Sequence, residues 1–363
     1  MTSIRVRLGD RSYPIVVTNT FQALPRHLAA AGLSPDHGWI LSHPELLRRY
    51  GAWLAGPLRR AGWTLRTLTV PPSETSKSLA VAERVIGRLA REAAMRVPVL
   101  FALGGGVVGD LTGLVAAAFR RGVPYVQVPT TLLAQVDSAI GGKVGVDLPQ
   151  GKNLVGQFYQ PRLVWNHLGL LTSLPARQRR SGLAEVIKYG IIADPALFGF
   201  LETHLPACLA MAPQAVRVMV ERSCRIKARV VSRDEREIGT LRAQLNFGHT
   251  LGHALEAATG YRRYTHGEAI AIGMCAAAEL GLELGHTSPS VFERIVRLIR
   301  TAGLPTVARG VRRSAVRKAL RYDKKFIHGR PRWVFVKRLG QVGVSESIPE
   351  AAVLRVLARY VQP

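Results

Sequence analysis

The sequence predicts a parallel α/β domain followed by a mainly α-helical domain, and three observations lead to this fold class. The 363 residues are enough for about two domains. In the first half, short apolar runs alternate with longer amphipathic stretches, which is typical of strands joined by helical crossovers. After about residue 172, strand-like runs become scarce. We therefore expect a boundary near residues 165–175, between domains 1–172 and 173–363.

The strands expected in the first domain are apolar runs bounded by Gly and Pro. They cover residues 39–41, 65–70, 97–103 and 125–128. Between them, residues 79–92 carry apolar side chains at helical spacing, and residues 111–119 are rich in helix-forming residues. This alternation predicts a sheet of mostly parallel strands.

The second domain is expected to consist mainly of helices. Helical patterns cover residues 215–231, 267–285 and 290–302, and one strand-like run follows at residues 333–336. The sequence shows no internal repeat and no low-complexity segment.

Composition narrows the class of protein. With 47% hydrophobic residues, the chain can bury a core and is neither disordered nor fibrous. The first residues carry charges throughout, so no secretory signal is expected, and the apolar run at residues 269–282 is too short to span a bilayer. Three scattered cysteines suit neither a disulfide framework nor a Cys-based zinc site, which favours a reducing, cytoplasmic setting.

The net charge of +26 has three interpretations. Basic residues can neutralise nucleic-acid phosphates, attract an anionic small substrate, or form a solvated surface without a specific partner. They are spread along the chain, without a basic arm or zinc-finger spacing. The charge alone therefore does not identify the function, and nucleic acid is not the expected partner.

A glycine-rich loop, GGGVVGD at residues 104–110, directly follows the apolar run 97–103 and precedes a helix. Glycines let the backbone approach a phosphate closely, and a helix N-terminus offers free N–H groups. Gly104, Gly106 and Gly109 satisfy G-x-G-x-x-G, but the acid expected about 20 residues later is missing. The loop predicts an anion site; the alternative is a tight turn whose glycines serve packing alone.

A polar cluster follows in residues 242–256. His249 and His253 are four residues apart, so they share one face if this stretch is helical. Arg242 and Asn246 extend that face, because the successive steps from Arg242 to His253 are 4, 3 and 4 residues. A helical edge with a cation, an amide and two imidazoles suits a polar cleft better than an apolar core.

Two further residues complete a candidate metal site. His266 precedes a helix of small residues, and Glu185 lies in an otherwise apolar helical run. Two His and one Glu with an open fourth position form a common catalytic zinc site. The spacing does not choose among His249, His253 and His266, and each could instead be a structural residue. Lys188, at i+3 from Glu185, needs a partner or a function in such apolar surroundings.

Polar groups also interrupt small-residue segments at 135–138, 141–143 and 151–153, where turns with surface charge are the simplest interpretation. Together, however, several segments resemble the 3-dehydroquinate synthase family of the sugar phosphate cyclases. In the family's order they are GGGVVGDLTG (104–113), RGVPYVQVPTTLLAQVDSAIGGKVGV (121–146), GKN (151–153), SLPARQRRSGLAEVIKYG (173–190), LNFGHTLGHALE (245–256), HGEAIAIGM (266–274) and, more loosely, DKK (323–325). Several long motifs that occur in the family's order are highly specific for this family.

The resemblance implies an N-terminal NAD-binding domain with a Rossmann-like parallel sheet, a C-terminal helical metal-binding domain, and usually a homodimer. By this correspondence, Glu185, His249 and His266 bind one divalent metal, zinc or cobalt, and His253 is the active-site histidine. The positions that match substrate-binding or catalytic residues are Asp137, Lys143, Asn153, Lys188, Lys227, Arg242, Asn246 and Lys325. Arg121 resembles an arginine that reaches the substrate phosphate across the dimer.

The cofactor positions follow from the same resemblance. Those that match NAD contacts are Glu74, Lys77, Gly105, Gly106, Val107, Asp110, Thr130, Thr131, Asp137, Ser138 and Lys152. One departure concerns this site: His43 stands where the family commonly has an acid near the cofactor ribose. The way in which the adenosine end of NAD is held is therefore expected to differ.

The implied activity is conversion of 3-deoxy-D-arabino-heptulosonate 7-phosphate to 3-dehydroquinate and phosphate, in the shikimate pathway. NAD would be used catalytically, without net redox change. Three rivals remain: another sugar phosphate cyclase, a metal-dependent alcohol dehydrogenase of related fold, and a non-catalytic binding paralogue. Asn246 and His253 favour the dehydroquinate branch, because relatives with other substrates tend to differ there.

Overall fold

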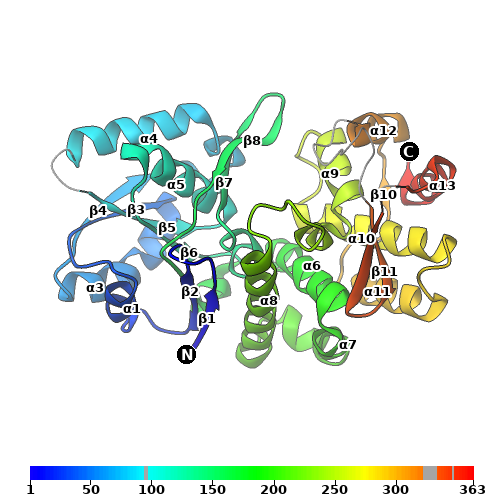
Figure 1. Ribbon diagram of the computed structural model, residues 1–363, viewed down its shortest axis with the longest axis horizontal. Helices are drawn as coiled ribbons and strands as arrows, with labels where there is room; N and C mark the ends of the chain where they lie inside the picture. The colour runs from blue at the N-terminus through cyan, green and yellow to red at the C-terminus, as the bar shows by residue number, and fades with distance from the viewer. Residues whose placement is uncertain (94–96, 322–332, 346) are drawn as a thin grey trace. The chain divides into compact units, whose positions relative to one another are not determined.

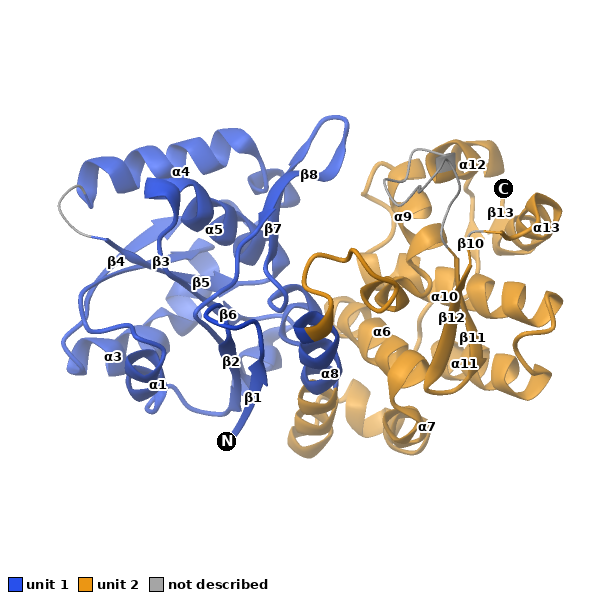
Figure 2. Ribbon diagram, in the orientation of Figure 1, with its two compact units in different colours: residues 1–174, 223–232 blue, residues 175–222, 233–363 orange. Residues whose placement is uncertain are grey.

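The computed structural model describes residues 1–93, 97–321, 333–345 and 347–363, and the chain divides into two compact units. The first unit comprises Met1–Leu174 and Ser223–Ser232, and the second comprises Pro175–Arg222 and Arg233–Pro363 (Figure 2). Part of one helix, α8 (Pro213–Arg233), therefore belongs to each unit.

The first unit is built on a seven-stranded sheet with the order β1-β2-β9-β6-β5-β3-β4. Its strands are β1 (Thr2–Val6), β2 (Tyr13–Thr18), β3 (His37–Ser42), β4 (Thr64–Thr69), β5 (Val99–Gly104), β6 (Tyr125–Pro129) and β9 (Leu163–His167). Neighbouring strands are parallel except β1 and β2, which pair antiparallel. The predicted parallel α/β sheet is confirmed, although the apolar runs do not predict β1, β2 or β9.

Helices cover both faces of this sheet, because successive side chains of a strand point to opposite sides. On β3, Trp39 and Leu41 pack with residues of α4 (Leu79–Glu92) and α5 (Gly106–Ala118). Ile40, between them, packs on the other face with residues of α1 (Leu24–Ala30) and α3 (Ala52–Arg60). Figure 1 shows these two helix pairs on opposite sides of the strands.

Helix α4 has the bounds that its sequence predicts, residues 79–92. Val81, Val85 and Leu89 follow one another at four-residue spacing and are buried, and the Ser78 side chain caps the first turn by accepting the N–H of Val81. Helix α5 begins at Gly106, five residues before its predicted start. The glycine loop is thus the N-terminus of this helix.

A hairpin of two further strands, β7 (Lys143–Leu148) and β8 (Gly151–Phe158), also belongs to the first unit. Residues 151–153 lie in β8, so the interpretation of that segment as a turn is wrong, whereas in the segment 141–143 only Lys143 belongs to a strand and both glycines before it have positive φ. Two glycines that face each other let these strands pair closely: a Cβ on Gly145 would lie 2.6 Å from the Val155 carbonyl oxygen, and one on Gly156 would lie 2.3 Å from that of Val144.

The second unit is mainly helical, as predicted, and α10 (His266–Glu283) lies at its centre. This helix packs against α6 (Ala176–Ala193), α9 (His249–Ala258), α11 (Pro289–Thr301) and α13 (Glu350–Tyr360). The unit also contains α7 (Pro195–Leu209), α12 (Arg313–Arg321), an antiparallel pair of β11 (Trp333–Arg338) with β12 (Gln341–Ser345), and a short parallel pair of β10 (Ala308–Arg309) with β13 (Val361–Gln362).

The helices predicted at residues 215–231, 267–285 and 290–302 correspond to α8, α10 and α11. Most of helix α10 is buried, because its small Ala and Gly residues let neighbouring helices approach closely. Within the described parts of the chain, we find no helix whose length and hydropathy would let it cross a membrane.

Candidate active site

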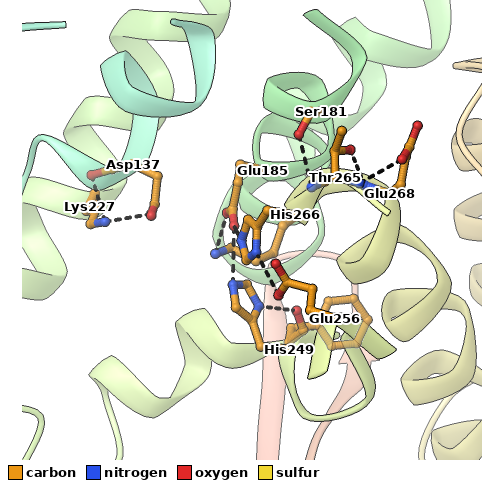
Figure 3. Close-up of polar contacts among 12 residues, drawn as sticks. Asp137, Ser181, Glu185, Lys227, His249, Glu256, Thr265, His266 and Glu268 are labelled. Atoms are coloured by element: carbon orange, nitrogen blue, oxygen red, sulfur yellow. Dashed lines mark hydrogen bonds and ion pairs between the residues drawn. The ribbon is translucent and has the colours of Figure 1, made fainter. Parts of the chain in front are cut away.

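Glu185, His249 and His266 converge in the second unit from three different helices. Glu185 lies in the middle of α6, and His249 and His266 are the first residues of α9 and α10. The Nε2 atoms of both imidazoles lie 3.3 Å from Glu185 Oε1 (Figure 3). One ligand atom of each residue lies within 4.8 Å of the others. Such a set fits a divalent cation with an open coordination position.

Glycines allow the three helices to come this close. A Cβ on Gly267 would lie 2.1 Å from the Ser181 carbonyl oxygen of α6, and one on Gly273 would lie 1.9 Å from the Gly248 carbonyl oxygen. Gly248 has a φ of 78°, which favours glycine, and it is the N-cap of α9. Larger side chains at 267 or 273 would push α10 away from its neighbours and separate the three converging side chains.

The first turn of α10 is fixed by a capping box. The Thr265 hydroxyl accepts the Glu268 N–H at 3.3 Å, and the Glu268 carboxylate accepts the Thr265 N–H at 2.8 Å. Arg177 of α6 donates to the same carboxylate at 2.7 Å and to the Arg263 carbonyl oxygen at 2.8 Å. These contacts hold His266 at the start of the helix.

The other ring nitrogen of each imidazole has its own partner. His249 Nδ1 lies 3.1 Å from the Phe247 carbonyl oxygen, and His266 Nδ1 lies 3.3 Å from Glu256 Oε2. With the proton on Nδ1, each Nε2 directs a lone pair toward the centre, which is the form of imidazole that binds a metal. Glu256, which the sequence pattern does not single out, thus orients His266.

A second group of possible ligands overlaps the first: His253, Glu256 and His266 also lie within 4.8 Å of one another. In that group His266 faces Glu256 through Nδ1. Since both Nε2 atoms instead converge on Glu185, the geometry favours the set of Glu185, His249 and His266. That is the set which the family resemblance implies.

Charge in this cluster is unevenly distributed. Burial raises the pKa of the Glu185 carboxyl, but the Lys188 ammonium, 2.5 Å away, and the two imidazoles hold it well below its ordinary value. Burial and Lys188 lower the pKa of His249 to about 4. Burial also acts to lower the pKa of His266, but Glu185 and Glu256 outweigh it and raise this pKa to about 10. Without a metal, His266 therefore carries the proton.

The single helical face expected from Arg242 to His253 is wrong. Arg242–Asn246 form a short 3-10 helix, and Gly248, in its left-handed conformation, turns the chain before α9 begins. Only His249 and His253 share a face, with ring centroids 5.3 Å apart. Residue spacing alone predicts one continuous helix here, because it does not show that a single glycine interrupts the chain.

Arg242 and Asn246 contact the preceding loop, residues 234–241. Arg242 donates to the Glu235 carbonyl oxygen, and Asn246 Nδ2 donates to Glu237 Oε1 at 2.9 Å. Asp234 closes the loop by accepting three backbone N–H groups. Glu237 is a further polar residue beside the candidate site that the motifs do not reveal. Three acids within the four residues 234–237 of a basic chain are the signal that could have pointed to it.

The glycine loop of the first unit brings together several predicted cofactor contacts. Gly105 is the N-cap of α5 and Gly106 its first residue. A Cβ on Gly105 would lie 3.0 Å from Thr131 Cγ2, and one on Gly106 would lie 3.2 Å from Ser138 Oγ. These side chains and the free N–H groups of the helix surround a place suited to a phosphate.

Other residues of this loop serve packing. A Cβ on Gly104 would lie 2.5 Å from the Val108 side chain, and one on Gly109 would lie 2.8 Å from Gln127 Oε1. Thr130 donates its N–H to the Gly104 carbonyl oxygen at 2.9 Å, and Val107 lies half-buried in the first turn of α5. The packing interpretation therefore applies to Gly104 and Gly109, whereas the anion site at Gly105 and Gly106 stays a prediction.

Lys77 joins several predicted site residues of the first unit. Its buried ammonium lies 2.5 Å from Asp110 Oδ2 and also donates to the Asn153 side-chain oxygen. Burial lowers the pKa of Lys77, but Asp110 more than compensates and raises it overall. Beside this group, Lys152 forms a 2.8 Å ion pair with Glu74. Asn153 has a φ of 54°, so the backbone is strained at this point of β8.

Asp137 and Lys227 also meet. Lys227 Nζ, on α8, lies 2.6 Å from Asp137 Oδ1 and 2.8 Å from the Asp137 carbonyl oxygen (Figure 3). Lys143, at the start of β7, is exposed and lies over the Phe158 ring at 6.0 Å. Lys325 lies outside the described residues.

Arg121 lies apart from the other predicted residues of the first unit. It is exposed and follows the C-terminal end of α5, opposite the end that carries the glycine loop. Arg120, Arg121 and Gly122 have φ values of 50°, 62° and 126°. Two consecutive non-glycine residues with positive φ indicate local strain, which is often found at functional positions.

Comparisons with known proteins agree with these motifs. Residues 67–181 match the family model of the 3-dehydroquinate synthase N-terminal domain, and residues 182–326 match that of the C-terminal domain. The 3-dehydroquinate synthase of Acidithiobacillus ferrooxidans is 44% identical over 100% of this chain and 99% of its own length. That of Pelotomaculum thermopropionicum is 46% identical over 99% of this chain and 96% of its own length.

The fold has solved counterparts. The 2-epi-5-epi-valiolone synthase of Streptomyces hygroscopicus, solved with NAD⁺ and Zn²⁺ bound, superposes with a TM-score of 0.85 and 26% identity, over 95% of this chain and 97% of that one. A probable glycerol dehydrogenase from Sinorhizobium meliloti has a TM-score of 0.64 at 15% identity, which shows a shared fold alone. Since both family models match in order and full-length relatives exceed 40% identity, this chain belongs to the 3-dehydroquinate synthase family.

Proposed function

We propose that this chain converts 3-deoxy-D-arabino-heptulosonate 7-phosphate to 3-dehydroquinate and phosphate, using NAD and one divalent metal, zinc or cobalt. The observation that carries this proposal is the converging set of Glu185, His249 and His266 in a chain of this family. Two His and one Glu fit zinc or cobalt, and the helix N-terminus after the glycine loop fits the pyrophosphate of a dinucleotide. When bound, these groups supply a Lewis acid and a hydride acceptor for the substrate hydroxyl.

The residues of the second unit have the following proposed roles. Lys188 keeps the Glu185 carboxylate ionised beside the metal position. His253, one turn beyond His249 and half-buried, holds or moves a proton at its imidazole. Arg242 and Asn246 exchange their contacts with the loop 234–241 for substrate oxygens.

For the first unit, we propose that Lys143 and Asn153 contribute to binding the anionic substrate, as Lys325 would from outside the described residues. Asp137 and Lys227 are proposed to act as one ion pair, since their side chains already contact each other. The NAD contacts are proposed to be Glu74, Lys77, Gly105, Gly106, Val107, Asp110, Thr130, Thr131, Asp137, Ser138 and Lys152. The domain limits 1–172 and 173–363 belong to the same proposal.

We further infer that the chain acts as a cytoplasmic homodimer in which Arg121 binds the substrate phosphate in the partner's site. Its exposure, its strained backbone and its place at the far end of α5 support a role outside its own glycine loop. Arg121→Ala should then lower activity, and mixing it with a metal-site variant such as Glu185→Gln should restore part of it through hybrid dimers. No recovery on mixing would contradict the role across the dimer.

The function is tested by mixing metal-loaded protein with NAD⁺ and the heptulosonate phosphate, and following phosphate and 3-dehydroquinate together. Equal amounts of both products, no net NADH and complete loss with a chelator are expected. Phosphate release without 3-dehydroquinate, or net NADH formation, would contradict the proposal. His253→Ala should lose most turnover yet keep its metal; loss of metal in this variant would mean that the ligands are misassigned.

A further inference from the structure

Three hydrogen bonds tie together the carboxyl ends of β4, β3 and β5 in the first unit. The Ser42 hydroxyl donates to the Leu103 carbonyl oxygen at 2.5 Å. The Val70 N–H donates to the Ser42 carbonyl oxygen at 3.0 Å. The ring of His43, the next residue, lies with Nδ1 3.0 Å from the Val70 carbonyl oxygen. His43 is therefore held in place at this edge of the sheet.

The register of the sheet places His43 next to the glycine loop. Ser42 pairs with Leu103, so His43 follows β3 where Gly104 ends β5. A carbonyl oxygen can only accept a hydrogen bond, so His43 Nδ1 is the donor to Val70. The remaining polar atom of the half-buried ring, Nε2, is then the one available to a ligand.

The strand order indicates which half of a dinucleotide would lie here. Strand β6 lies on one side of β5, and β3 lies on the other. Thr131 and Ser138, which follow β6, line the glycine loop from their side. In open parallel sheets the pyrophosphate sits at the glycine loop, and an acid at the end of the neighbouring strand binds the adenosine ribose. His43 occupies the position of that acid.

We propose that His43 recognises the adenosine ribose in place of an acid, and that the site therefore accepts the 2′-phosphorylated dinucleotide NADP nearly as well as NAD. This inference rests on the proposed function, because it concerns the same cofactor site. A carboxylate accepts hydrogen bonds from the ribose hydroxyls and repels a 2′-phosphate. An imidazole has no negative charge, and its one remaining nitrogen can meet either a hydroxyl or a phosphate.

The surrounding charges support this assignment. Glu74, after β4, is paired with Lys152 at 2.8 Å. Glu45, in the short helix α2 (Pro44–Leu46) that follows His43, is exposed. The net charge of +26 also attracts the more negative of the two cofactors more strongly.

The test is a binding titration of the full-length protein with NADH and with NADPH, in which fluorescence at a fixed salt concentration reports binding. For the natural chain, the two dissociation constants should agree within about tenfold. In His43→Asp the added carboxylate should raise the ratio of the NADPH to the NADH constant by at least about tenfold, because like charges disfavour the phosphate. His43→Gln, which is neutral, should leave the ratio within about threefold of the natural chain.

Two controls make the outcome decisive. Thermal unfolding of each variant shows whether it folds, and if His43→Asp does not fold, the ratio of the two constants in the natural chain decides the inference by itself. Glu45→Gln should not change the ratio. The inference is overturned if NADPH binds the natural chain more than about tenfold more weakly than NADH, or if Glu45→Gln alone lowers the ratio of the NADPH to the NADH constant. Binding of neither dinucleotide would instead refute the cofactor part of the proposed function.

Discussion

Glu256 acts on the candidate metal site through His266 rather than by direct contact with the proposed ion. Its carboxylate lies 3.3 Å from His266 Nδ1, while the Nε2 of the same ring faces Glu185. Such a partner fixes the orientation and tautomer of the imidazole and increases its basicity. A change at Glu256 is therefore expected to alter the affinity for the metal.

Replacing Glu256 by Ala should weaken metal binding by about 10–100-fold, because the ring loses its orienting acceptor. Glu256→Gln, which keeps an acceptor but not the charge, should lose less. The affinities can be measured by competition with a chromophoric chelator. Glu283→Gln, at the other end of α10 and ion-paired with Arg359, is a matched control that should not change the affinity. Equal affinities in all three variants would refute the role.

Metal binding should also depend on pH through His266. The pKa of this imidazole is raised to about 10 in the metal-free chain, so a metal must displace its proton at neutral pH. His249, with a pKa lowered to about 4, is already neutral and releases none. Affinity should therefore increase with pH, by up to about tenfold per pH unit, until His266 loses its proton.

Calorimetric titration of the metal in two buffers of different ionisation enthalpy would count the protons. About one proton released per metal near pH 7.5 is expected. A buffer-independent heat would show that His266 is not a ligand or is not protonated beforehand.

At the scale of single residues, the sequence predicts which side chains carry chemistry better than how they are held. The residue types suggest a metal site but leave three histidines as possible ligands, and only the family resemblance selects Glu185, His249 and His266, which the structure brings together. The contact of Glu256 with His266 is not predicted, because it depends on the packing of α9 against α10. Local periodicity carries no information about such tertiary contacts.

At the scale of elements, glycines on α10 determine how closely its neighbours approach. Gly273→Ala would place a Cβ 1.9 Å from the Gly248 carbonyl oxygen, so α9 and α10 would have to separate. We expect destabilisation by about 1–3 kcal/mol or more, together with weaker metal binding. Denaturant unfolding and the chelator competition would measure both effects.

Gly199→Ala in α7 is the matched control, because its added Cβ meets nothing within 4 Å. It should stabilise the chain slightly, by about 0.5–1 kcal/mol, since Ala is the better helix former. If both substitutions had the same effect, the close approach at Gly273 would not matter.

The elements predicted from sequence are those with strong local patterns. Helix α4 and strands β3 to β6 combine apolar periodicity with Gly and Pro boundaries. The hairpin β7–β8 is missed because its glycines resemble turn signals, whereas in the structure they serve close pairing of the strands. The break before α9 is missed because one left-handed residue, Gly248, does not alter the hydrophobic pattern.

At the scale of the whole molecule, the charge of +26 should influence how the anionic substrate arrives. We expect kcat/KM to fall as ionic strength rises from about 0.02 to 0.2 M, because screening shortens the reach of the field. The value of kcat should change little, since contacts inside the site are screened less. Both constants can be measured at a series of neutral-salt concentrations at constant pH. A salt-independent kcat/KM would mean that the charge does not steer the substrate to the protein.

Helix α8 affects how the chain can fold during its synthesis. The first unit includes Ser223–Ser232, whose Lys227 contacts Asp137 and whose Ser232 hydroxyl accepts the Arg7 N–H. At Leu174 the ribosome has made every strand of the main sheet but not this segment. About 60 more residues, or roughly 3–12 s of translation, must follow. During that interval Asp137 and Arg7 lack these partners, so the first unit cannot complete its fold before synthesis of the second unit has begun.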